Sequence, residues 1–503
     1  MRERGRGSLA ALQDVSGKLG GRLNLSAAQA VALASIGVVG LVLRLLWLLR
    51  TPNAPFTDFL SDQQFARQFA SGVFPQGVTF QGAGYPLALG LAFRLAGSSD
   101  PLVGKVENLL FSLATLALCA YIFARLTPRR WVAIAATALV ALLPAYIAYT
   151  SVLGTEIVFT FCLAATLALQ LARWNWRLRY PLMGLLIGYG AITKPYFLVY
   201  PAVAALLLWL TERDLRQAAR LLAISVLGAL VVVAPITWEN YVQLHRFILN
   251  TYNGSFVLFV NSNSDNTTGA WLPFSSIHVS AAFRQQLLQM GVRYPDVPTN
   301  QGYAPLDPLF MAQARLWIFT HPLQFAHLGT LRLRDTFFNG AWDVRSYASD
   351  GLTNQQVANS PLLRVFFRLA TLALATLSVA GFVTVGLGVA QVVWAVSSRA
   401  RRGRAMSPAL AYPATLGAYY LVVLFATEGQ PRYAFPALLP FAFALVYLLS
   451  LLVSGVHRWV VARAAQPAPA VASAPRSVPR SALDIETVKR PRVQVAPRSE
   501  ARG

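Results

Sequence analysis

Apolar stretches about 20 residues long recur along the chain from Val31 to Ser454, and no other feature restricts the fold so strongly. A helix that crosses a bilayer needs roughly 20 mostly apolar residues. Of the 503 residues, 55% are hydrophobic and 13% are charged, which excludes an ordinary water-soluble globule of this size. We therefore predict an all-α polytopic membrane protein with about ten transmembrane helices and further membrane-surface helices in its outer loops.

The basic residues predict the orientation of these helices. The formal net charge is +23, but the Lys and Arg residues lie between apolar segments and at the two ends of the chain. Short loops rich in Lys and Arg stay in the cytoplasm, and alternating spans bring TPRR, RWNWRLR, TERDLRQAAR and SSRARRGRAM to one side. We predict an integral protein of the bacterial inner (plasma) membrane with both termini cytoplasmic. Its partner is the lipid bilayer and not nucleic acid, because no basic amphipathic face is present.

The same pattern predicts three parts of the chain. Residues 1–28 form a cytoplasmic basic N-terminus, residues 29–455 a multi-span domain, and residues 456–503 a disordered basic tail rich in Pro, Ala, Ser and Arg. The multi-span domain has two large outer loops, at about 50–104 and 238–362. Within the first of them, QGAGYPLALGLAFRLAG is too short to span and predicts a membrane-surface or re-entrant helix. We interpret the first apolar stretch as a retained signal anchor, since it is too long for a cleaved signal peptide.

Charged residues gather near the outer ends of the predicted spans. Asp58 and Asp62 lie in the first outer loop, Glu156 begins the fourth span, Lys194 ends the fifth, and Arg432 precedes the last. Charges in a membrane protein are costly unless they face a water-filled cavity or a partner. Their location on one side predicts a functional site there.

These segments resemble the GT-C superfamily of glycosyltransferases, the polyprenyl-phosphate-sugar-dependent group that includes protein O-mannosyltransferases and lipid A aminoarabinose transferases. The family has a catalytic aspartate after its first span, and the frame Asp58, Asp62, Ala66, Phe69, Gly72 fits the spacing. Asp62 stands where the family usually has Tyr, so either carboxylate could be the functional one. We favour Asp58, while the alternative reading is that both are solvated loop acids or helix caps.

Further segments resemble the family in the same order along the chain. The segment PITWENYVQLHRFI is similar to an RNY segment, although Glu239 stands where Arg is common. QPRYAFPALLP, which contains Arg432 and Tyr433, is similar to a signature near the last span. The other matching segments are AGYP, SVLGTEIVF, GLLIGYGAITKP and NGSFVLFVNSNSDNTTG.

The resemblance implies a GT-C-like fold over about residues 30–455 and transfer of a sugar from a polyprenyl-phosphate donor to a protein, lipid or glycan acceptor on the outer face. Asp58 would act as general base. Lys194 and Arg432 would bind the leaving phosphate, although both could instead be interfacial anchors. The other predicted substrate-binding residues are Asp62, Glu156 and Tyr433. For Glu156, a plain first-turn acid at a helix N-terminus is the alternative.

No cofactor is predicted with certainty, and two other function classes stay open. Asp58 and Asp62, as an i,i+4 pair, could hold a divalent cation, but the five histidines show no ligand spacing. A transporter or lipid flippase would also use polytopic helices with intramembrane charges, although the sequence shows no internal repeat. An O-antigen-ligase-like enzyme is the third possibility, because the second outer loop carries several arginines. The sequence does not identify the sugar, the lipid length or the acceptor.

Overall fold

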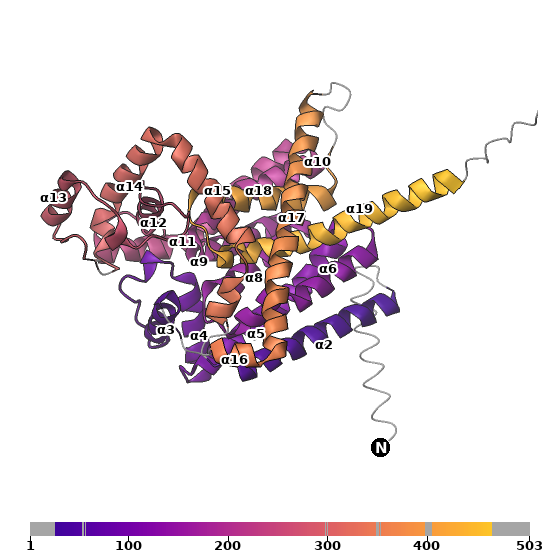
Figure 1. The fold of residues 1–503 in the computed structure, drawn as a ribbon, viewed down its shortest axis with the longest axis horizontal. Helices are drawn as coiled ribbons and strands as arrows, with labels where there is room; N and C mark the ends of the chain where they lie inside the picture. Colours follow the sequence, from indigo (N-terminus) through magenta and orange to yellow (C-terminus); the bar gives the residue numbers. More distant parts are fainter. Residues whose placement is uncertain are drawn as a thin grey trace, which may run out of the picture. The chain divides into compact units, whose positions relative to one another are not determined.

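The computed structural model describes residues 26–52, 55, 57–296, 298, 300–348, 352, 354–397 and 405–464. Over these residues the chain is helical and contains no strand (Figure 1). Most of the predicted basic N-terminus and disordered tail, and most of the basic SSRARRGRAM turn, lie outside the described residues.

The helices of the first half of the chain are α2 (Ala27–Arg50), α3 (Thr57–Ala70), η1 (Val78–Phe80), α4 (Gly84–Ala96), α5 (Pro101–Leu126), α6 (Arg130–Leu142), α7 (Pro144–Ala148), η2 (Tyr149–Ser151), α8 (Thr155–Leu171), α9 (Trp176–Thr193), η3 (Pro195–Val199), α10 (Tyr200–Glu212) and α11 (Leu215–Leu244). Those of the second half are α12 (Gly254–Asn261), η4 (Phe274–Ser276), α13 (Ala281–Gln289), α14 (Tyr303–Thr320), α15 (Pro322–Phe338), the π-helix η5 (Val344–Ala348), α16 (Asn354–Asn359), α17 (Pro361–Ser397), α18 (Pro408–Ala426), η7 (Pro431–Ala437) and α19 (Leu438–Ala464).

Seven helices in the described part of the chain are long and apolar enough to cross a membrane, which makes this an integral membrane protein. An eighth span is possible if α6 and α7 are counted as one, although they bend by 51° at Leu143 and Pro144. The remaining two predicted spans correspond to α8, which has only 17 residues, and α9, whose first turn carries Arg177 and Arg179. Every predicted span thus has a helix, while the number of ten crossings stays a prediction.

Helices α9 and α11 pack closely because their interface is built from small residues (Figure 1). A Cβ atom added to Gly184 would lie 2.7 Å from the Ser225 carbonyl oxygen and 2.8 Å from the Cα atom of Gly228. The close approach fixes the end of α9, where the backbone N–H of Lys194 caps the helix by donating to the Gly190 carbonyl. The packing therefore determines the position of Lys194.

The predicted short apolar helix of the first outer loop is α4, which has 13 residues and ends at Gly97 in the left-handed conformation. It packs against α3 at Gly90, where a Cβ atom would lie 2.6 Å from the Cβ of Phe69 and 2.7 Å from the Ala66 carbonyl oxygen. The α3–α4 pair is thus held as one unit, with Asp58 and Asp62 on α3.

The two predicted outer loops contact each other through aromatic side chains. The rings of Phe80 in the first loop and Tyr303 in the second are stacked with centroids 4.8 Å apart. Phe256 of α12 and Phe310 of α14 continue this cluster, with centroids 5.3 Å apart. The second loop is therefore a folded region with its own apolar core, placed against the first loop.

Candidate functional site

A cavity of about 180 Å³ lies where helix ends and outer-loop segments converge. Its walls come from α3, the segment before α4, the start of α8, the end of α9, the start of α12, the end of α18 and η7. All six residues predicted to form the site line this cavity: Asp58, Asp62, Glu156, Lys194, Arg432 and Tyr433. Side chains separated by up to 375 positions in the sequence are thus brought together as predicted, although their proposed roles are not tested by this arrangement.

Asp58 lies in the first turn of α3 and forms an ion pair across the cavity. Its Oδ2 is 3.2 Å from Nη2 of Arg432, and its Oδ1 accepts a hydrogen bond from Nε2 of Gln81 at 2.9 Å. The Asp58 side chain is 43% exposed, so a substrate group can reach it. Arg432 is only 13% exposed, which leaves its guanidinium largely shielded from water.

Asp62 lies one turn further along α3 in a very different environment. Its residue is 5% exposed, and it points into the same group of charges. Burial raises the pKa of the Asp62 carboxyl well above its usual range, and the negative charge of Asp58 raises it further. Burial thus favours the protonated form of Asp62, whereas Asp58 is paired with Arg432. The structure thus gives different surroundings to the two acids, of which the sequence favoured Asp58.

Glu156 and Lys194 form the second ion pair of the cavity. Oε1 of Glu156 lies 3.6 Å from Nζ of Lys194, and the Glu156 side chain is 4% exposed. The other oxygen, Oε2, is buried without a hydrogen-bond partner. The Lys194 ammonium also lies 5.7 Å from the centre of the Tyr433 ring. Both residues thus face the cavity, and Glu156 is at the same time a first-turn acid of α8, as the alternative reading expects.

Glu428 is a further acid of the site, which the sequence motifs did not identify. The Tyr433 hydroxyl donates to its Oε2 at 3.3 Å and accepts from Nη2 of Arg432 at 3.1 Å. Burial raises the pKa of Glu428 to about 7. Its position in TEGQPRY, four residues before Arg432, could have identified Glu428 as a site residue, but none of the matching motifs included it.

Aromatic rings surround the guanidinium of Arg432. Its Cζ atom lies 5.0 Å from the ring centre of Tyr433, 5.6 Å from that of Tyr347 and 5.9 Å from that of Phe59. Phe59 in turn packs on Gly154, where a Cβ atom would lie only 2.7 Å from its ring. This close approach brings α3 against the start of α8, and so brings Asp58 and Glu156 to one cavity.

A divalent cation at Asp58 and Asp62 stays a hypothesis. Within the described ranges, no group of three or more His, Cys, Asp or Glu side chains is placed to hold a metal ion. The Asp58 carboxylate is already bonded to Arg432 and Gln81. The charges that face the cavity acids are therefore those of Lys194 and Arg432.

The motif with Glu239 lies apart from the cavity. Glu239 accepts a hydrogen bond from Gln243 at 2.9 Å, and neither residue lines the cavity. The neighbouring Asn240 donates to the carbonyls of Ile248 and Asn250 and so shapes the turn after α11. The departure from the family pattern at Glu239 is therefore outside the site.

No family model matches this sequence, and no curated protein matches it. Solved structures do match. The archaeal oligosaccharyltransferase AglB from Archaeoglobus fulgidus, in complex with an inhibitory peptide and a dolichol-phosphate, shares 12% identity over 89% of this chain and 53% of its own, with a TM-score of 0.43. ArnT from Cupriavidus metallidurans, bound to undecaprenyl phosphate, shares 16% identity over 83% of this chain and 78% of its own, with a TM-score of 0.39.

The chain spans about half the length of the oligosaccharyltransferase. With identities below 25% and TM-scores below 0.5, these likenesses do not establish an activity, and the case for one rests on the cavity itself.

Proposed function

We propose that this chain is a membrane glycosyltransferase that moves a hexose or pentose from a polyprenyl-phosphate donor to an acceptor on the outer face of the membrane. One observation carries the proposal: a reachable carboxylate, Asp58, and two cations, Lys194 and Arg432, line one cavity in a protein of membrane-spanning helices. Transfer from a sugar phosphate needs these groups, a base for the acceptor and fixed positive charge for the leaving phosphate.

Asp58 is the proposed general base because its carboxylate is exposed in the cavity and lies beside Arg432. A carboxylate must be within hydrogen-bond reach of the acceptor group to take its proton as that group attacks the anomeric carbon. Asp58 is the more exposed of the two acids on α3, whereas Asp62 is buried and favours its protonated form. A neutral Asp62 would instead donate a hydrogen bond to a substrate oxygen.

Lys194 and Arg432 are the proposed phosphate ligands. The leaving polyprenyl phosphate carries its own negative charge, so it needs fixed cations more than a general acid. The guanidinium can bind two phosphate oxygens at once, and the ammonium acts as a point charge beside it. Each cation is now paired with a carboxylate. A bound phosphate would therefore compete with Asp58 for Arg432, and this competition would free the base when the donor is in place.

Glu156 and Tyr433 complete the proposed substrate-binding groups. Glu156 holds Lys194 at the cavity wall, and its unpartnered oxygen can accept a hydrogen bond from a sugar hydroxyl. The Tyr433 hydroxyl links Arg432 to Glu428. The acceptor is proposed only as a class, a protein, lipid or glycan, at the outer surface of a bacterial inner membrane with both termini in the cytoplasm.

The positions of the charges favour a transferase over a transporter. Transporter sites typically lie near the bilayer midplane, on helices that are broken there. Here Asp58 comes from the short helix α3, and Glu156, Lys194 and Arg432 come from helix ends. We expect a cavity at helix ends and loops to admit an acceptor from the outer face, as transfer requires.

The proposal is tested by a transfer assay in membranes with a panel of polyprenyl-phosphate sugars and the variants Asp58→Asn and Asp62→Asn. Loss of a general base should reduce turnover by about 10²- to 10⁴-fold in Asp58→Asn. Asp296→Asn, at an exposed aspartate of the second outer loop, is the matched control and should keep full turnover. Undiminished turnover in Asp58→Asn contradicts the assignment of the base, and equal loss in both α3 variants indicates a paired-acid or metal site.

A further inference from the structure

A buried carboxylate outside the cavity, Asp343, is bonded to a tyrosine from a distant segment. Its residue is 4% exposed, and its Oδ2 accepts a hydrogen bond from the Tyr149 hydroxyl at 2.7 Å. Asp343 immediately precedes the π-helix η5, and Tyr149 begins η2. A buried carboxylate destabilises the folded protein unless it is hydrogen-bonded. The Asp343–Tyr149 hydrogen bond therefore holds the two side chains in one arrangement.

The π-helix η5 is held at its other end by the same short segment. Ser151, two residues after Tyr149, donates from its hydroxyl to the Ala348 carbonyl at 2.9 Å. π-helical turns are rare and occur frequently at functional sites. Tyr149 and Ser151 therefore fix both ends of a five-residue turn, one at Asp343 and one at Ala348.

The residue of this turn that lies against Arg432 is Tyr347. Its ring packs edge-on against Phe59 with centroids 5.6 Å apart, and it lies 5.6 Å from Cζ of Arg432. Tyr347 thus forms one wall around the guanidinium that pairs with Asp58. A shift of η5 would move that wall.

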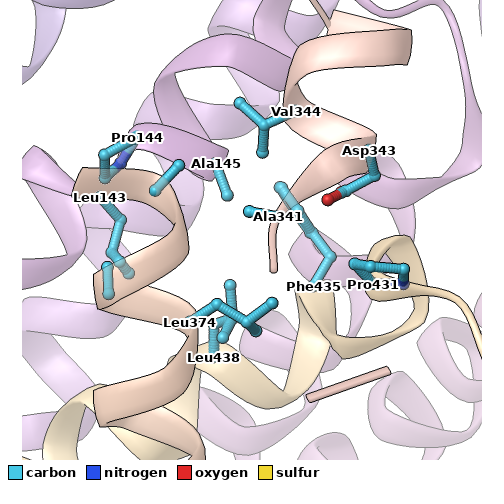
Figure 2. Close-up of a pocket in the computed structure, with 12 residues that line it drawn as sticks. Leu143, Pro144, Ala145, Ala341, Asp343, Val344, Leu374, Pro431, Phe435 and Leu438 are labelled. Atoms are coloured by element: carbon cyan, nitrogen blue, oxygen red, sulfur yellow. The ribbon is translucent and has the colours of Figure 1, made fainter. Parts of the chain in front are cut away.

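The space between Asp343 and the segment that carries Arg432 is small. Figure 2 shows Asp343 beside Pro431 and Phe435, on the side of a cavity opposite Leu143 and Pro144. The cavity measures about 20 Å³, room for about one water molecule. Phe435 is also fixed by Tyr149, whose ring centroid lies 4.8 Å away. Displacement of Asp343 is therefore transmitted to the residues around Arg432.

We infer that the Asp343–Tyr149 hydrogen bond positions Arg432 for the proposed sugar transfer by holding Tyr347 against its guanidinium. The role of this hydrogen bond in catalysis rests on the proposed function. The structural coupling from Asp343 through Tyr347 to Arg432 does not depend on it. Asp343, Tyr149 and Tyr347 act through Arg432 and are positioning residues. The family motifs and the cavity-lining residues include neither Asp343 nor Tyr149.

The first test measures the shielding of Arg432 without any substrate. Purified full-length protein in detergent is treated with phenylglyoxal, and modification of Arg432 is followed by mass spectrometry. Tyr149→Phe removes the hydroxyl but keeps the ring that packs on Phe435. Modification should become about fivefold faster, the population change expected when one buried hydrogen bond is lost.

Tyr420→Phe is the matched control, because the Tyr420 hydroxyl is buried without a hydrogen-bond partner. It should leave the modification rate of Arg432 unchanged. An unchanged rate in Tyr149→Phe, or an equal rise in both variants, overturns the inference. The modification rate of Arg432 is measured without any sugar donor. A negative result in this test is therefore distinct from a failure of the proposed function, which the transfer assay tests.

The second test uses rescue by a conservative substitution. Asp343→Asn keeps an oxygen that can accept from Tyr149, whereas Asp343→Ala does not. The asparagine variant should keep Arg432 shielded, and the alanine variant should expose it. In the transfer assay, Tyr149→Phe should raise KM for the donor with a smaller change in kcat. Equal exposure of Arg432 in the two Asp343 variants contradicts the role of the hydrogen bond, and Tyr149→Phe decides the question if Asp343→Ala does not fold.

Discussion

The carboxylate of Asp58 lies 3.2 Å from the guanidinium of Arg432, although the two residues are 374 positions apart. One belongs to the first outer loop and the other to the turn before the last helix. The two charges of this pair therefore face each other across the cavity. In the proposed mechanism, a phosphate that binds Arg432 would compete with Asp58 and so free the proposed base.

The geometry of Arg432 predicts that lysine cannot replace it. A lysine keeps the positive charge but lacks the planar fork that can contact Asp58, Tyr433 and a phosphate together. Arg432→Lys should lower kcat/KM by about 10- to 100-fold, the loss of one to two charge-assisted hydrogen bonds. Steady-state kinetics with the polyprenyl-phosphate donor measures the effect. Arg293→Lys, at an exposed arginine of the second outer loop, is the control, and an equal effect in both variants contradicts the prediction.

The raised pKa of the Glu428 carboxyl predicts that the free energy of unfolding depends on pH. Its folded-state pKa of about 7 is above the ordinary value of 4.5, so the folded protein binds the proton more tightly than the unfolded chain does. The stability that Glu428 contributes is therefore greatest below pH 4.5, falls as the pH rises towards 7, and is level above that. The fall amounts to roughly 3 kcal/mol as an order of magnitude.

Glu428→Gln should remove this dependence, because the amide does not ionise. Thermal unfolding of the detergent-purified protein at pH 6 and pH 8 measures it, and the variant should lose less stability between the two values than the natural protein. Glu212→Gln, at an exposed glutamate, controls for the change of charge and should keep the natural dependence. A variant that keeps the full loss between the two values places the titrating group elsewhere.

The close packing around Gly154 predicts that the junction of α3 and α8 has no room for a larger residue at this position. An added Cβ atom would lie 2.7 Å from the Phe59 ring and 3.0 Å from Oε2 of Glu156. Gly154→Ala should therefore displace one of these side chains and destabilise the protein by about 1–3 kcal/mol. Gly37→Ala is the matched control, because nothing lies within 4 Å of its added atom, and helix propensity makes that change neutral or stabilising. Equal melting temperatures for the two variants contradict the packing argument.

Sequence reasoning located the cavity residues because hydropathy and charge place them at the outer ends of apolar segments. It favoured Asp58 over Asp62 from the motif spacing and could not predict their exposure, because that exposure depends on how α3 packs against α4 and the start of α8, and no local pattern encodes this packing. The apolar segment from Trp131 to Thr150 is long enough for one span by its sequence, whereas the chain bends by 51° between α6 and α7. A proline that begins a helix needs no kink, so its presence alone did not predict the angle.

The residues that sequence reasoning missed share a physical cause. Glu428 and Asp343 each lie in a connection between helices, without a periodic pattern or a spacing to mark them. Their importance comes from burial, which raises the pKa of Glu428 to about 7 and ties Asp343 to Tyr149. Burial of a loop acid is decided by distant segments, so it appears only in three dimensions.

The pairing of Glu156 with Lys194 predicts a non-additive double substitution. Lys194→Gln alone leaves the Glu156 carboxylate buried, with one oxygen already unpartnered, and should destabilise the protein by about 3–5 kcal/mol. Lys194→Gln with Glu156→Gln removes both charges and should recover part of that loss, with a coupling of about 0.5–3 kcal/mol. Chemical or thermal unfolding of the two single variants and the double variant measures it. Lys194→Gln combined with Asp296→Asn should be additive, because Asp296 lies outside the cavity and is exposed. Additivity in the first pair would mean that the 3.6 Å contact contributes nothing to the folded state, and that Lys194 is instead held by the Tyr433 ring.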